Sequence, residues 1–173
     1  MELGPVDRIT ADAIGEPGAR TFYLQARHGE QLVSVIVEKQ QVQLLAASVL
    51  DLLADLDVET GLGPSGEELE LEAPIDPRWR AGRLSIGFDQ DRRLFLIEVE
   101  EFQPEVEDDD PRSLLVGEPE TIRIWASTEQ MLALSRHGSE AAERGRPACQ
   151  YCGNPMDPEG HACPAMNGHS KRD

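Results

Sequence analysis

Two neighbouring stretches near the start of the chain alternate between apolar and polar residues. The apolar positions are Phe22, Leu24 and Ala26 in the first stretch and Val33, Val35 and Val37 in the second. A period of two is typical of a strand with one buried face, and His28-Gly29 between the stretches suits a tight turn. This region therefore predicts a β-hairpin.

The spacing of apolar residues changes to three and four in the segment that follows. These residues are Val42, Leu45, Val49, Leu52, Leu53 and Leu56. Such spacing places a single apolar stripe along a helix, and Gly61 and Pro64 lie beyond its end. We expect an amphipathic helix from about residue 40 to residue 56.

The second half of the chain repeats this order with an added strand. Residues 82–102 predict a hairpin that turns at Asp89-Gln90-Asp91, and residues 121–127 predict one further strand. Ser127 with Gln130 forms a capping-box pattern that opens a second helix, on which Met131 and Leu134 are apolar. Hairpin followed by helix thus occurs twice, which indicates either an internal ββα duplication or the chance order of an α+β protein.

These elements predict an α+β fold. We expect an antiparallel sheet, built from two hairpins plus one further strand, with two helices on one face, because hairpins need no crossover and each apolar stripe must be buried. Residues 1–143 would form this body, with surface loops at 61–77 and 103–120. Residues 144–148 would be a linker, and residues 149–173 a small zinc-knuckle or ribbon-like tail.

The charge of the chain is unevenly distributed. The formal net charge is -17, yet residues 141–173 contain equal numbers of acids and bases, so the excess lies in the body. Acids cluster in residues 51–72 and 100–110. Because nucleic-acid affinity depends on Lys and Arg neutralising phosphates, nucleic acid is not expected to bind the body. The acidic runs indicate either solvated loops and faces or a docking surface for a basic protein partner.

The hydropathy pattern also bears on location. No stretch approaches the roughly 20 apolar residues of a membrane span, and the first ten residues lack the basic start and apolar run of a signal peptide. We therefore expect a cytoplasmic protein with no membrane partner.

Every cysteine of the chain and two of its four histidines lie between residues 149 and 169. An odd number of thiols in a reducing compartment favours a metal over disulfides. Cys149, Cys152 and Cys163 would supply three ligands of a tetrahedral Zn²⁺ site, and either His161 or His169 the fourth. Four protein ligands leave no open position, so the zinc would be structural. Reduced thiols in a disordered tail and a redox pair are the alternatives; the redox pair is disfavoured because the motif follows a linker.

Three segments together resemble a known family. They are GARTFYLQARHGEQ, WRAGRLSIGFD and the closing pattern C-x-x-C-G-x-P-x-D-P-x-G-H-x-C-P. The chain resembles, over essentially its whole length, an actinobacterial family of unknown function, domain-of-unknown-function family 3090. The resemblance implies that Cys149, Cys152, His161 and Cys163 are the matching tail positions, and it implies a cytoplasmic actinobacterial protein without an established activity.

Other candidate sites rest on fewer residues. Arg20, Tyr23, Arg27 and His28 share or adjoin the polar face of the first hairpin and could hold a phosphorylated small molecule; the alternative is that the arginines pair with nearby acids. His137 has no evident acid partner in the sequence, and neither a G-x-S-x-G nor a P-loop pattern occurs. The sequence therefore favours a protein without catalytic activity, although it leaves an enzyme open.

Two functions of different classes follow. The favoured one is a binding or adaptor protein, in which the acidic body and the zinc tail both contact a protein partner. The alternative is a ligand-binding module or enzyme that uses the Arg20, Tyr23, Arg27 and His28 face, which a pocket lined by those side chains would support. Nucleic-acid binding through the near-neutral tail is a third hypothesis.

Overall fold

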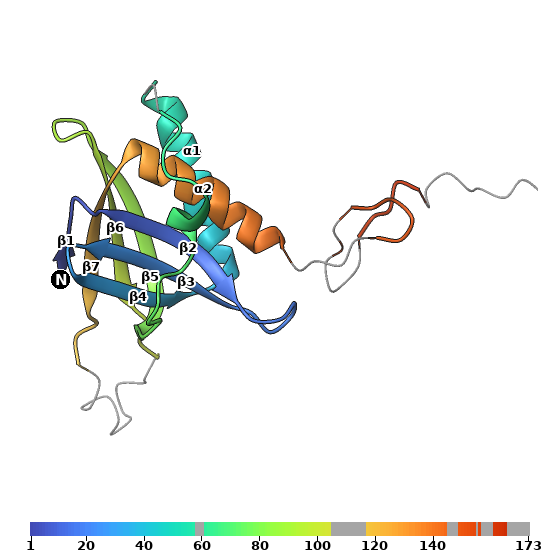
Figure 1. Ribbon diagram of the computed structural model, residues 1–173, viewed down its shortest axis with the longest axis horizontal. Helices are drawn as coiled ribbons and strands as arrows, with labels where there is room; N and C mark the ends of the chain where they lie inside the picture. The colour runs from blue at the N-terminus through green and yellow to red at the C-terminus, as the bar shows by residue number, and fades with distance from the viewer. Residues whose placement is uncertain (58–60, 105–116, 145–148, 155, 157–160, 166–173) are drawn as a thin grey trace, which may run out of the picture.

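The computed structural model describes residues 1–57, 61–104, 117–144, 149–154, 156 and 161–165, and it has an α+β fold (Figure 1). The elements in chain order are β1 (Glu2–Leu3), β2 (Arg8–Ile14), β3 (Thr21–His28), β4 (Gln31–Val37), α1 (Lys39–Asp55), the 3₁₀ helix η1 (Gly66–Leu69), β5 (Pro77–Asp89), β6 (Leu94–Glu101), β7 (Thr121–Ser127) and α2 (Thr128–Glu143). The two predicted hairpins, the further strand and both helices are present; β1, β2 and η1 were not predicted.

All seven strands belong to one sheet, in the order β1-β7-β6-β5-β4-β3-β2. Strands β2 to β4 form one antiparallel meander and strands β5 to β7 form another, but β4 pairs with β5 in parallel, as β1 does with β7. The prediction of an antiparallel sheet was therefore wrong, and the sheet is mixed. The physical reason is α1: the chain leaves β4 through this helix and crosses back over the sheet, so it enters β5 in the direction of β4.

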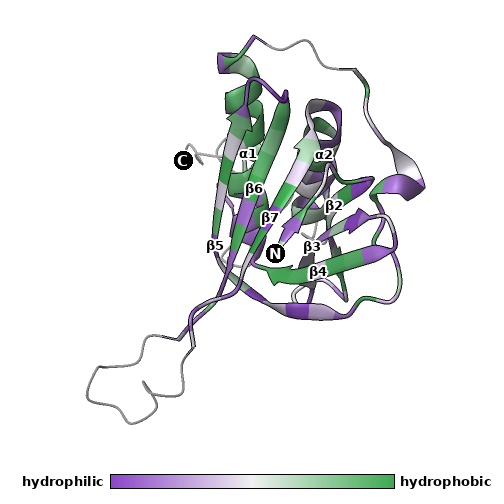
Figure 2. Cartoon of the chain, turned by 90° about the vertical axis from the view of Figure 1, so that its left-hand side faces the viewer, coloured by the Kyte–Doolittle hydropathy of each residue, from purple (hydrophilic) through white to green (hydrophobic). Residues whose placement is uncertain are grey.

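The sheet curls because its two edges are consecutive in the chain. Strand β1 ends at Leu3 and β2 begins at Arg8, although the two strands lie at opposite ends of the strand order. A flat sheet of seven strands would separate its edges by about 29 Å, whereas five residue steps span at most about 18 Å. Figure 2 shows the result as two wings, one of strands β5 to β7 and one of strands β2 to β4, with both helices behind them.

Residues 4–7 join the two edges by direct hydrogen bonds. The Val6 amide donates to Trp125 O in β7 (2.9 Å), and the Asp7 amide donates to Arg27 O at the end of β3 (2.8 Å). Gly4 makes this approach possible, because a Cβ there would lie 2.6 Å from the same Trp125 oxygen. Two adjacent residues thus bind both meanders.

The core lies between the curled sheet and the helices. Phe22, Leu24 and Ala26 of β3 face the predicted partners Val37, Val35 and Val33 of β4, and all six are buried. In α1 the buried stripe contains Val42, Leu45, Ala46, Val49 and Leu53.

The predicted capping box of α2 is confirmed: Gln130 N donates to Ser127 Oγ (3.2 Å) and Ser127 N donates to Gln130 Oε1 (2.9 Å). The same glutamine donates from Nε2 to Val6 O (2.9 Å), which ties α2 to the N-terminal segment.

The segment after η1 is fixed against the outside of β3 by a buried glutamine. Gln25 is 2% exposed; its Oε1 accepts from Glu72 N (2.7 Å) and its Nε2 donates to Glu72 O (2.9 Å). Both backbone polar groups of Glu72 are satisfied in this way, much as a strand partner would satisfy them.

Neither α1 nor α2, the two α-helices of the described residues, is long and apolar enough to cross a membrane.

Substitution of Gly4 tests the closure of the sheet. We expect Gly4→Ala to lower the free energy of unfolding by about 3 kcal/mol, because it combines a positive φ with a clash against Trp125 O. Gly18→Ala is the matched control, since Gly18 also has a positive φ but no atom within 4 Å of the added Cβ; we expect a loss of about 1 kcal/mol. Urea unfolding measures both, and equal losses would contradict the role of this contact.

Substitution of Gln25 tests the attachment of the segment after η1. Gln25→Leu keeps the volume but leaves the Glu72 amide and carbonyl without their partners, and we expect it to cost about 2–4 kcal/mol in chemical unfolding. Gln31→Leu, at an exposed position of β4, should stay within about 0.5 kcal/mol of the unsubstituted protein. A Gln25 variant as stable as the Gln31 variant would show that the segment is held by other contacts.

Candidate metal centre

Cys149 and Cys152 lie on a tight turn whose backbone is closed by two hydrogen bonds. Gly153 N donates to Cys149 O and Cys149 N donates to Asn154 O, both at 2.8 Å. Gly153 has a φ of 73°, a conformation that glycine adopts without a steric penalty. The turn directs both thiols to one side, which is the local geometry of a metal knuckle.

His161 and Cys163 complete the cluster from a second stretch of chain. Cys149 Sγ lies 3.8 Å from Cys163 Sγ, and Cys152 Sγ lies 3.1 Å from His161 Nε2. The four ligand atoms all lie within 4.8 Å of one another. In a tetrahedral site with zinc–sulfur bonds of about 2.3 Å, two sulfurs are about 3.8 Å apart and a sulfur and a nitrogen about 3.5 Å apart. The Cys149–Cys163 distance matches this geometry, and the Cys152–His161 distance would lengthen slightly around an ion.

The surroundings of Cys149 favour its thiolate form. The Tyr151 amide, whose nitrogen lies 3.4 Å from the sulfur, and then the Cys152 amide lower the pKa of the Cys149 thiol. Thiolates are the form in which cysteines bind metals. Cys149 and Cys163 are buried, while Cys152 and His161 are half-buried. The cluster therefore has the donor set and the partial shielding needed to hold a metal ion.

The structure brings together the four tail residues that the sequence singled out first. His169, the alternative fourth ligand, lies outside the described residues, as do residues 145–148 of the predicted linker and 157–160 between the ligand pairs. The domain boundaries, the ribbon-like form of the tail and the identity of the metal therefore stay predictions.

Two of the hairpin candidates share one face of β3. Tyr23 and Arg27 point the same way, and Arg27 Nε lies 3.3 Å from Glu72 Oε2. Arg8 Nη1 lies 3.3 Å from that same oxygen, so one carboxylate faces two guanidinium groups.

The other two hairpin candidates lie at the ends of β3. Arg20 precedes the strand and donates from Nη1 to Ala141 O in α2 (2.8 Å). His28 ends it, with Nδ1 3.0 Å from Pro5 O. The structure thus places Tyr23 and Arg27 together and separates Arg20 and His28 from each other by the length of the strand. Binding of a phosphorylated ligand by these four residues stays a prediction.

The structure also supplies the acid partner that His137 lacked in the sequence. His137 Nε2 lies 2.8 Å from Asp12 Oδ2, across the contact between α2 and β2. The residues are 125 positions apart, and β2 was not recognised as a strand, so no local pattern could have paired them. Their side chains are only 13% and 14% exposed.

Comparison with family models gives a match over nearly the whole chain. The model described as "Protein of unknown function (DUF3090)" matches residues 1–163, which include the four cluster residues. Comparison with curated proteins finds no match, and neither does comparison with solved structures. Because the matched range covers the body and the cluster alike, the chain belongs to the DUF3090 family of proteins of unknown function.

Proposed function

We propose that the protein is a non-catalytic binding protein whose C-terminal cluster holds a structural zinc ion and contributes to association with a protein partner. The observation that carries the proposal is the convergence of Cys149, Cys152, His161 and Cys163, with all four ligand atoms within 4.8 Å. Three sulfurs and one imidazole nitrogen suit Zn²⁺, which favours tetrahedral sites of this composition. Four protein ligands leave no coordination position for water or substrate, which supports a structural role.

A metal would also account for how the tail keeps a fixed shape. Among its described residues only Cys149 and Cys163 are buried, and both belong to the cluster. Outside the cluster these described residues form no hydrophobic core, so metal–ligand bonds are the main source of free energy available to fold them. Cysteines that bind zinc as thiolates must stay reduced, which supports a reducing compartment such as the cytoplasm.

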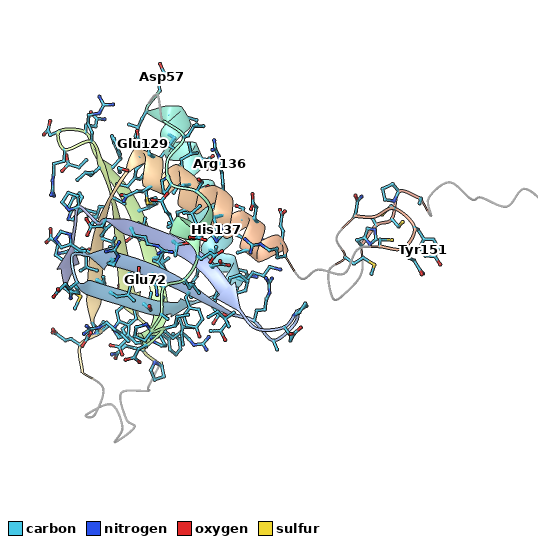
Figure 3. The ribbon with its side chains drawn as sticks, viewed as in Figure 1. Asp57, Glu72, Glu129, Arg136, His137 and Tyr151 are labelled. Atoms are coloured by element: carbon cyan, nitrogen blue, oxygen red, sulfur yellow. The ribbon has the colours of Figure 1, made fainter. Side chains whose placement is uncertain are left out.

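Two features support association with a protein. Tyr151 lies between the two knuckle cysteines and is 63% exposed (Figure 3). Tyrosines contribute strongly to protein interfaces, because a large apolar ring carries a polar group that finds a partner. The net charge of -17 favours a basic partner and speeds its approach. In this proposal the tail supplies the specific contact and the body supplies the electrostatic attraction.

Metal analysis of single-histidine variants tests the zinc site. We expect the full chain, purified without added metal, to contain about one equivalent of zinc, as a closed four-ligand site retains its ion. His161→Asn should lose most of it, because one of four ligands is removed, while the matched variant His169→Asn should keep it. A normal zinc content in His161→Asn, together with loss in His169→Asn, would assign the fourth ligand to His169. Less than about half an equivalent in the unsubstituted chain would contradict the site itself.

Partner capture tests the role of the tail. A pull-down at two salt concentrations compares three baits: the full chain, the variant Tyr151→Ser and a chain ending at Arg146. We expect Tyr151→Ser to keep its zinc and to retain less of the partner, the shortened chain to retain least, and raised salt to weaken capture because exposed charges are screened. Capture of the same proteins in equal amounts by all three baits would show that the tail is dispensable.

A further inference from the structure

A cavity of about 670 Å³ lies in the body, between β2, α2 and the segment of residues 62–75. Its volume falls in the range of small-molecule sites, which is roughly 300–1,000 Å³. The lining does not include Arg20, Tyr23, Arg27 or His28, and it is separate from the metal cluster. Figure 3 shows Arg136 and His137, which both line it, on α2.

The wall formed by residues 62–75 is fixed by contacts outside the cavity. Thr10 Oγ1, buried in β2, donates to Leu69 O, and Gln25 binds both backbone groups of Glu72. At the other end Gly63 lies against the first turn of α2, where an added Cβ would be 2.4 Å from Glu129 O. The wall is held at three points, so the cavity exists before any ligand enters, which lowers the entropic cost of binding.

The floor contains the Asp12–His137 pair. Asp12 Oδ2 binds His137 Nε2 at 2.8 Å, and Asp12 Oδ1 accepts from the Ala13 amide at 2.7 Å. Both carboxylate oxygens are therefore engaged within the protein. The imidazole is fixed in one orientation, and its Nδ1 has no hydrogen-bond partner in the part of the chain that the structure describes. This nitrogen offers a polar contact to a ligand.

Unpaired positive charge marks the same cavity. Among the arginines of the described ranges, most have an ion pair, a side-chain hydrogen bond or a ring contact. The exceptions are Arg93, Arg136 and Arg144, and two of these three line the cavity. In a chain this rich in carboxylates, an arginine without a partner beside a preformed cavity is available to a ligand anion.

The other residues that line the cavity limit the charge of the ligand and favour a ligand with an apolar body. Glu70 and Glu140 also line the cavity and would repel a dianion such as a phosphate more strongly than a monoanion. Ile14 and Leu62 line it with 47% and 89% of their surfaces exposed, so a ligand with an apolar body would remove apolar area from water. We propose that this cavity binds a small carboxylic acid with an apolar body, its carboxylate paired with Arg136 and its body against Ile14 and Leu62.

Calorimetry and methyl NMR of the full chain test the site with 1-naphthaleneacetate as the probe. We expect binding with a Kd on the order of 0.1–1 mM and shifts of the Ile14 and Leu62 methyl signals. Arg136→Gln should weaken binding about tenfold, because a charge-assisted pair is lost. The matched control is Arg93→Gln, which removes the same charge from another unpaired arginine outside the cavity and should change the Kd less than about twofold. Leu62→Ser, at a position exposed in the free protein, should weaken binding without unfolding the chain.

Neutral and dianionic analogues separate charge recognition from apolar adsorption. The amide 1-naphthaleneacetamide should bind the unsubstituted protein and Arg136→Gln equally weakly, and 1-naphthylmethylphosphonate should bind no more tightly than the carboxylate. Equal affinity for the acid and the amide, tighter binding of the phosphonate, or an unchanged Kd in Arg136→Gln would each overturn the proposal. So would the absence of carboxylate binding at about 5 mM, well above the expected Kd, in a protein whose NMR spectrum shows it folded. None of these results bears on the zinc content, so the two proposals fail separately.

Discussion

The bonding of residues 4–7 to both meanders is the constraint on which the rest of the body depends. Val6 binds Trp125 in β7 and Asp7 binds Arg27 in β3, so the two meanders are held together at this point. Gln130 extends the same connection to α2, since one side chain both caps the helix and binds Val6 O. A flat sheet with the same strands would satisfy the strand pairing within each meander, but it would lose these bonds and the enclosed core.

The curl also places β2 under α2, and this contact creates the cavity. Gly138 allows the close approach, because a Cβ there would lie 3.0 Å from a Val42 methyl and 3.5 Å from Ala11 Cβ. Ser135 Oγ donates to Ala46 O (2.9 Å), which fixes α2 against α1 as well. The helix is thus set between α1 and β2, and its face from Ala133 to Arg144 is left opposite residues 62–75. The position of Arg136 and His137 is a consequence of packing that begins at the N-terminal segment.

Local patterns predicted much of this fold, and non-local pairing accounts for most of what they missed. Buried positions of β6 alternate with half-buried ones, and Ser127 with Gln130 marks the start of α2 within four residues. Strands β2 and β3 each carry a buried polar residue on the outer face, Thr10 under Leu69 and Gln25 against Glu72, and both contacts join positions more than 40 apart. Strand β1 has only two residues, and its pairing with β7 joins positions about 120 apart. The parallel pairing of β4 with β5 depends on where α1 packs, which no residue of either strand encodes.

The same distinction explains why the metal cluster could be found in the sequence and the cavity could not. A metal binds through a few ligands whose types are rare and whose spacing is short, so Cys149, Cys152, His161 and Cys163 stand out in a chain with no other cysteine. The cavity is built from common residue types on three separate elements, and its polar pair joins Asp12 to His137 across 125 positions. The free energies that form the two sites differ as well. Burial of the core positions α2 over β2, whereas in the proposed zinc site metal–ligand bonds would hold a tail whose described residues bury little else. Hence a chelator should act on the tail alone, while a change that loosens α2 should act first on the cavity.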